Sequence, residues 1–186
     1  IDAAMPRLVR AATEFADPFF DLVTEASVVL AGLELASKVP RKMTKAVDRL
    51  VKVAEFCSNK YNSTTFKDNI LLHNFICSAY AQVSSFTNNA FSMALKSGRH
   101  ARKLLHTAVE KGSRNELSEE EQEELGFQFH KYYLCEITGK IGKSLCQLTE
   151  TSKKYRDEAI IELEKYVELT FGDNNCFSED DRGQAI

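Results

Sequence analysis

The sequence predicts an all-α protein, a single-domain helical bundle of about six or seven amphipathic helices. Apolar residues recur at spacings of three and four along most of the 186 residues, which is the period of a helix with one buried face. Only 8 Gly and 3 Pro occur, too few for an all-β protein, which needs a turn about every 8–12 residues. An apolar share of 44% is enough to bury a core and excludes a wholly disordered chain. We expect the bundle to occupy residues 1–172 and an acidic, loose tail to occupy 173–186.

Two helices are expected near the start of the chain. Asp17-Pro18 provides an N-cap and a first-turn Pro for a helix over about 18–37. This helix is apolar on most sides, so we expect it to be the central helix of the bundle. Pro40 starts a further helix over about 40–60, whose apolar seam alternates in steps of four and three: Met43, Val47, Leu50, Ala54, Cys57 and Tyr61.

The middle of the chain predicts a helix that ends near Phe86 and a second apolar repeat that stops at Gly112. Thr65 and Asp68 form a capping arrangement at the start of the first of these helices. Thr87-Asn88-Asn89 is expected to be a loop or a kink, and Gly98 to be another break.

The last third of the chain predicts one long helix and one shorter one. Ser118 and Glu121 form a capping box that opens the long helix, in which Gly139 and Gly142 indicate a close helix contact or a bend. After a polar run over 149–154, the last helix ends at Gly172 and carries the stripe Ile160, Leu163, Val167 and Phe171.

The cysteines and one glycosylation sequon point to different compartments. Five Cys at low density suggest no disulfide framework, and Cys135 and Cys146 on one helix would lie too far apart to bridge. Reduced thiols in the core fit a cytoplasmic or peripheral membrane protein. However, Asn62-Ser63-Thr64 is a sequon, so Asn62 is a candidate glycosylation site and a secreted helical signalling protein stays open. The chain begins at Ile1 rather than Met, which leaves the compartment open, and no apolar run predicts a membrane span.

No local motif predicts catalysis or metal binding. The four His show no i, i+4 pair, and no CxxC or HExxH is present. Gly139–Ser144 is similar to the end of a phosphate-binding loop, but it lies within a helical repeat that no strand precedes. Cys135 follows His130 by five residues, yet its stripe position indicates a core thiol. We therefore expect a non-enzymatic protein with no cofactor and no metal.

Charge is distributed unevenly along the chain, and this is the main functional signal. The net charge is −3, yet residues 38–52 hold six basic residues against Asp48 alone, which gives +5. Four of these recur at 3-4-3 spacing and form what we call the basic stripe: Lys42, Lys45, Arg49 and Lys52. A second basic group contains Arg99, Arg102 and Lys103, whereas six Glu lie between Glu116 and Glu124.

Three explanations of this charge remain open from the sequence. The basic stripe is an ordinary solvated helix face, or a docking site for anionic lipid headgroups or an acidic protein, or it pairs with the Glu116–Glu124 cluster. Nucleic acid is not expected, because no aromatic side chains interleave with the stripe to stack bases. The aromatic-rich faces also allow a bundle that carries an apolar ligand such as a lipid. The sequence does not indicate an oligomeric state.

One short stretch resembles a known family. Leu50-Val51-Lys52-Val53-Ala54, a polar turn and Phe66 are similar to part of the tumour-necrosis-factor-induced helical family that binds phosphoinositides. The similarity is confined to residues 50–66. It implies an affinity for phosphoinositides but transfers no site residue.

Overall fold

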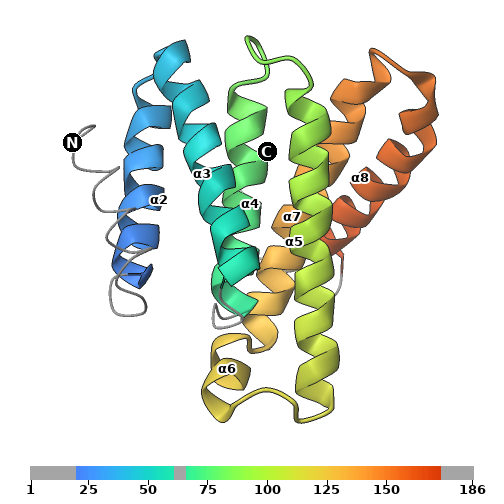
Figure 1. Ribbon diagram of the computed structural model, residues 1–186. Coiled ribbons are helices and arrows are strands. Elements are labelled where there is room, and N and C mark those ends of the chain that lie inside the picture. The colour runs from blue at the N-terminus through green and yellow to red at the C-terminus, as the bar shows by residue number, and fades with distance from the viewer. Residues whose placement is uncertain (1–19, 61–65, 173–186) are drawn as a thin grey trace. The chain divides into compact units, whose positions relative to one another are not determined.

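Figure 1 shows the computed structural model, which describes residues 20–60 and 66–172. Within these residues the protein is an all-α helical bundle of seven α-helices without strands, as the sequence predicts. The helices form two compact units, α2 and α3 in the first and α4 to α8 in the second. The single bundle expected over residues 1–172 stays a prediction, and the tail, the Asp17-Pro18 cap, Thr65 and Asn62 lie outside the described residues.

The first unit is a pair of packed helices, α2 (Phe20–Ala36) and α3 (Pro40–Lys60). Lys38 turns the chain between them in the left-handed region, with φ at 55°. The seam predicted for α3 is confirmed where its side chains are described: Met43, Val47, Leu50 and Ala54 are all buried. On α2 the apolar side chains of Val29 and Leu33 are exposed to solvent. The prediction that this helix is the central helix of the bundle is therefore not confirmed.

The second unit is built around α5 (Ala90–Ser113) and α7 (Phe127–Thr149). On one side α5 packs against α4 (Phe66–Gln82), and on the other it packs against α7, which in turn packs against α8 (Arg156–Phe171). Figure 1 shows these four long helices, with the short helix α6 (Glu119–Glu124) at one end between α5 and α7. A short 3-10 turn, η1 (Lys153–Tyr155), links α7 to α8. Their shared core contains Ile70, Leu95, Ala101, Leu105, Ile137, Ile141, Leu145 and Ala159.

Three glycines inside α5 and α7 allow these helices to approach their neighbours closely, and none of the three breaks its helix. A Cβ on Gly142 would lie 2.9 Å from Leu163 Cδ2, and one on Gly139 would lie 2.8 Å from the Tyr166 ring, so α7 touches α8 closely here. The close contact expected of Gly139 and Gly142 is confirmed. The break expected at Gly98 is wrong, because Gly98 is buried inside α5 and faces Ile141.

The capping box at Ser118 is confirmed, but the helix that follows is short. The Ser118 Oγ accepts from the Glu121 N–H at 3.2 Å, and the Glu121 carboxylate accepts from the Ser118 N–H at 3.3 Å. The chain then leaves the helix at Leu125 and restarts at Phe127, with Gly126 as the N-cap. One long helix from Ser118 was therefore the wrong expectation, since Gly126 divides it into α6 and α7.

The last helix presents an unexpected face to the core. The predicted stripe is largely outward, with Ile160, Val167 and Phe171 exposed. In their place α8 buries Ala159, Glu162 and Thr170. The end at Gly172 is confirmed, since its N–H donates to the Glu168 carbonyl at 2.8 Å.

Candidate functional site

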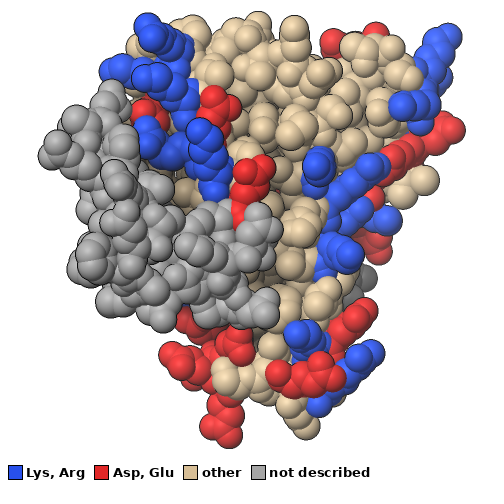
Figure 2. All heavy atoms as spheres, viewed as in Figure 1, with Lys and Arg blue, Asp and Glu red and all other residues tan. Residues whose placement is uncertain are grey.

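The basic stripe lies on the exposed side of α3. Its 3-4-3 spacing places its members on one helix face, away from the seam of Met43, Val47 and Leu50. Lys42, Lys45 and Lys52 are exposed and take part in no ion pair among the described residues. Figure 2 shows Lys and Arg side chains gathered over this part of the first unit.

Arg49 is the exception within the stripe, because its guanidinium is already occupied. It donates to both carboxylate oxygens of Glu34 on α2, at 3.2 Å and 3.4 Å. Both side chains are largely shielded, with 21% exposure for Arg49 and 11% for Glu34. A bidentate pair of this kind fixes α3 on α2 and leaves little free charge for a partner. The positive charge of the stripe that remains available to a partner is therefore that of its three lysines.

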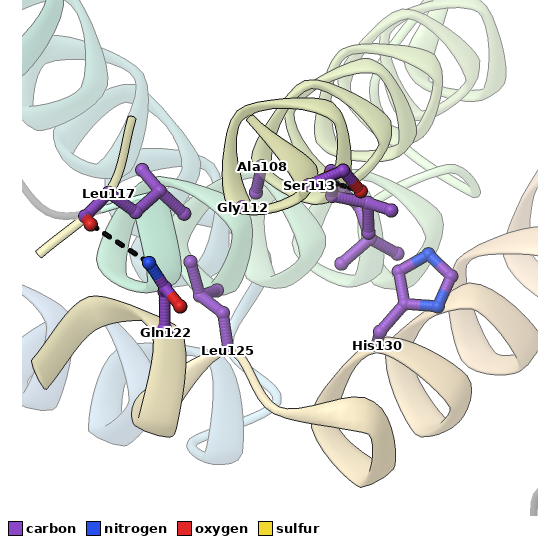
Figure 3. Close-up of a pocket in the computed structure, with 9 residues that line it drawn as sticks. Ala108, Gly112, Ser113, Leu117, Gln122, Leu125 and His130 are labelled. Carbon is purple, nitrogen blue, oxygen red and sulfur yellow. Dashed lines mark hydrogen bonds between the residues drawn. The ribbon is translucent and has the colours of Figure 1, made fainter. Parts of the chain in front are cut away.

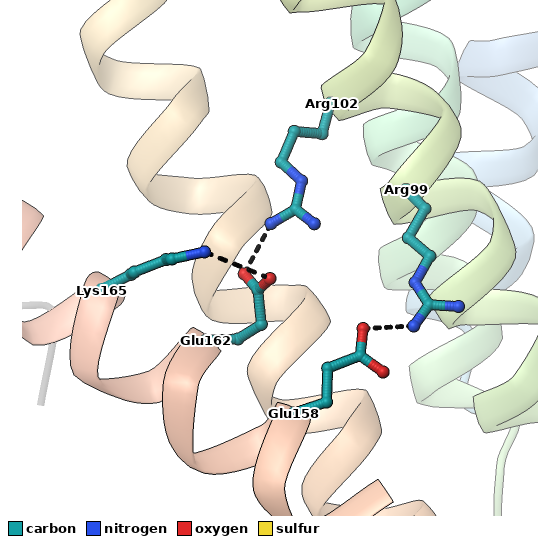
Figure 4. A network of polar contacts seen from close by, with 5 residues as sticks. All are labelled: Arg99, Arg102, Glu158, Glu162 and Lys165. Carbon is teal, nitrogen blue, oxygen red and sulfur yellow. Dashed lines mark hydrogen bonds and ion pairs between the residues drawn. The ribbon is translucent and has the colours of Figure 1, made fainter.

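The second basic group is also largely occupied within the protein. Figure 4 shows Arg99 and Arg102 reaching from α5 to the carboxylates of Glu158 and Glu162 on α8. The Arg102 pair is short, 2.5 Å, and the Glu162 side chain is only 5% exposed. Lys165 Nζ lies 3.9 Å from the same carboxylate.

These pairs separate the candidate residues into two kinds. Arg99 and Arg102 hold α5 to α8, whereas Lys103 is exposed and in no ion pair within the described part of the chain. In Figure 2 the basic side chains on the α5 side lie beside acidic ones. The partners of the arginines are on α8 and not in the Glu116–Glu124 cluster, where Glu124 pairs with Lys67 at 3.2 Å.

The four histidines come together in pairs that the sequence spacing did not reveal. The rings of His73 and His100 meet edge to face with centroids 4.2 Å apart, and those of His106 and His130 lie 6.4 Å apart. Burial, and secondarily His100, lowers the pKa of His73 to about 4. Burial and then the neighbouring His106 also lower the pKa of His130. Residue spacing along the sequence can indicate only pairs on one helix, whereas each of these pairs joins two different helices.

Neither a metal site nor a reactive thiol is evident among these groups in the described residues. Among residues 20–60 and 66–172, no group of three His, Cys, Asp or Glu side chains could hold a metal ion. Burial raises the pKa of the Cys77 thiol to about 11, which makes it a poor nucleophile. The Cys135 Sγ lies 3.4 Å from the Thr170 Oγ1 and is fully buried, as expected of a core thiol.

Two hollows among the described residues of the second unit bear on ligand binding. A groove of about 1020 Å³ runs between α5, α7 and α8, and its lining mixes apolar side chains such as Leu134 and Leu169 with the charged Arg102, Lys165 and Glu168. A smaller cavity of about 180 Å³ lies where the end of α5, α6 and the start of α7 meet, and its lining is mostly apolar. Neither combines the volume and the apolar lining that a lipid chain needs, so the lipid-carrier hypothesis gains no support.

Comparisons with known proteins returned no match, whether to a family model, a curated protein or a solved structure. Over the part of the chain that the structure describes, none of the helices has the length and apolar content to cross a bilayer.

Proposed function

We propose that this chain is a non-enzymatic interaction module that docks on anionic lipid headgroups through Lys42, Lys45 and Lys52. The observation that carries the proposal is the contrast between the basic groups. Arg49, Arg99 and Arg102 all pair with carboxylates of the protein, whereas the three stripe lysines are exposed and in no ion pair within the described residues.

The geometry of the stripe suits a flat, charged surface. Ten residues of α3 separate Lys42 from Lys52, a length of about 15 Å along the helix axis. The exposed Lys38 and Arg41 add charge at the start of this face. Lysine is a compact charge on a flexible stem, which favours diffuse attraction to headgroups over a fixed bidentate contact. With about 1 kcal/mol for each lysine near an anionic leaflet, attachment would be weak and reversible.

Vesicle co-sedimentation tests the proposal. The wild-type chain is compared on phosphatidylcholine vesicles with and without phosphatidylserine and phosphatidylinositol bisphosphate. Reversal of two stripe lysines, K42E/K45E, should weaken binding to the anionic vesicles by at least about 30-fold, from about 1 kcal/mol lost per lysine. High salt should weaken wild-type binding in the same way.

A matched control keeps the net charge equal. K143E/K153E changes the total charge by the same amount at two exposed lysines that belong to the second unit and not to the stripe. This variant should bind nearly as wild type. Equal loss in both double variants, or no binding of wild type to anionic vesicles at low salt, would contradict the lipid proposal. The second of these results would favour an acidic protein as the partner.

A further inference from the structure

A pocket of about 180 Å³ in the second unit is partly open to solvent, since Val109, Ser113 and Gln122 in its lining are exposed. It lies between the end of α5, the following turn, α6 and the start of α7 (Figure 3). Its walls are mainly aliphatic, and three polar side chains lie among them: Ser113, Gln122 and His130.

Two of these polar groups already use their donors on the backbone. The Ser113 Oγ donates to the Val109 carbonyl at 2.9 Å, and the Gln122 amide nitrogen donates to the Leu117 carbonyl at 3.0 Å. His130 differs from both, because its Nε2 is buried and has no hydrogen-bond partner in the structure. Figure 3 shows its ring extending from α7 toward α5. A buried nitrogen without a hydrogen-bond partner is unfavourable, so a molecule that supplies the missing bond gains affinity here.

The electrostatics of the pocket select a neutral ligand. His130 is uncharged near pH 7, because burial and the neighbouring His106 both lower its pKa. No carboxylate or ammonium group belongs to the described lining. The free imidazole nitrogen accepts or donates a hydrogen bond according to its tautomer, and a hydroxyl group can meet either need.

The volume of the pocket is enough to enclose one ring, and its open side leaves room for a substituent. An apolar cavity of about 150 Å³ in another protein is known to hold benzene, so about 180 Å³ has room for a six-membered ring with one substituent. We propose that this cavity is a binding site for a small neutral ring compound that carries one hydroxyl group, with the hydroxyl on His130 Nε2 and the ring against Leu105, Ala108 and Leu125. This site is separate from the basic stripe and does not depend on lipid docking.

Phenol is the probe, and toluene is its match without the hydroxyl group. The full chain, labelled with nitrogen-15, is titrated with each compound while the imidazole nitrogens of the four histidines are followed by NMR. Phenol should give a saturable shift of the His130 Nε2 signal at millimolar concentration. Toluene should bind more weakly and leave that signal nearly unmoved.

Two variants separate the hydrogen bond from the cavity. H130F keeps a ring but removes the nitrogen, and it should weaken phenol about tenfold while leaving toluene unchanged. A108L fills the space from α5 and should abolish binding of both. Gly112→Ala fills less of the pocket, since its Cβ would meet only Leu117 Cδ1, at 3.8 Å. This variant should weaken the binding of both compounds.

The outcomes that overturn the proposal are distinct. No saturable phenol shift in the wild-type chain would show that the cavity holds only water. Phenol binding that H130F leaves unchanged would show that the hydroxyl does not lie on His130. Binding that A108L and G112A both leave unchanged would place the ligand elsewhere. Circular dichroism of each variant confirms that the comparison is made between folded proteins.

Discussion

Replacing Arg102 with Met should remove the main partner of a buried carboxylate. Glu162 is 5% exposed on α8, and after the change its nearest cation would be Lys165, whose Nζ is 3.9 Å away and whose side chain is 56% exposed. Met preserves the packing of the aliphatic stem, so the change isolates the charge. Breaking a buried pair from one side costs about 3–5 kcal/mol. Because Arg102 is itself 22% exposed and Lys165 remains, we expect about 2–3 kcal/mol.

Arg99 gives the matched control on the same helix. It pairs with Glu158, but the two side chains are 45% and 39% exposed, and exposed pairs contribute about 0–1 kcal/mol. With a urea dependence of about 2 kcal/mol per molar, Arg102→Met should lower the unfolding midpoint by about 1–1.5 M, and Arg99→Met by less than about 0.5 M. Circular dichroism measures the midpoint, and amide exchange in α8 reports the local effect.

A double variant tests the cause. Replacing Glu162 with Leu in the Arg102→Met background removes the carboxylate that has lost its partner. This second change should restore most of the lost stability, because an apolar replacement of a buried pair is often neutral. The coupling energy should then be about 2 kcal/mol. Equal costs for Arg102→Met and Arg99→Met, or purely additive effects in the double variant, would refute this reasoning.

Two further predictions concern the histidines and the glycines. His73 has a pKa of about 4 in the folded protein against 6.5 in the unfolded chain, so the unfolded state binds more protons between these pH values. The free energy of unfolding should therefore be highest above pH 6.5. It should fall by about 1–2 kcal/mol toward pH 4, after allowing for the partial exposure of His73. Urea unfolding at pH 7.5 and 5 measures the larger part of this loss, which His73→Leu should reduce. A stability that does not change over that interval would contradict the prediction. Gly142→Ala gains about 1 kcal/mol of helix propensity but places a Cβ 2.9 Å from Leu163 Cδ2, so we expect a net loss of about 1 kcal/mol from overpacking. Gly112→Ala, with 3.8 Å of clearance, should be neutral or stabilising when both variants are unfolded in urea, and a stabilising Gly142→Ala would show that α8 moves aside freely.

Features set by neighbouring residues could be predicted from the sequence. The all-α class, the limits of α3 at Pro40 and Lys60, the capping box at Ser118 and the end of α8 at Gly172 are all confirmed. Each depends on hydrogen bonds and apolar spacing within about one or two helical turns, which a single sequence displays directly. Gly126 was missed because a lone glycine inside an acidic, helix-favouring stretch gives only a weak local signal.

The candidate site depended on contacts between helices. The sequence placed Arg49, Arg99 and Arg102 in the same class as Lys42, Lys45 and Lys103, because all are basic residues on helix faces. The structure separates them, since the three arginines lie opposite Glu34, Glu158 and Glu162.

The sequence by itself therefore determined the all-α class, both ends of α3, the start of α6, the end of α8 and the basic face of α3. Only the tertiary structure decided which charges stay open, that α8 buries Glu162 and exposes Val167, and that His130 faces a cavity without a partner. The physical reason is how far apart along the chain the interacting residues lie. Helix formation is governed by residues a few positions apart, whereas the free energy of a charge or an imidazole depends on what another helix, up to about 60 residues away along the chain, places beside it.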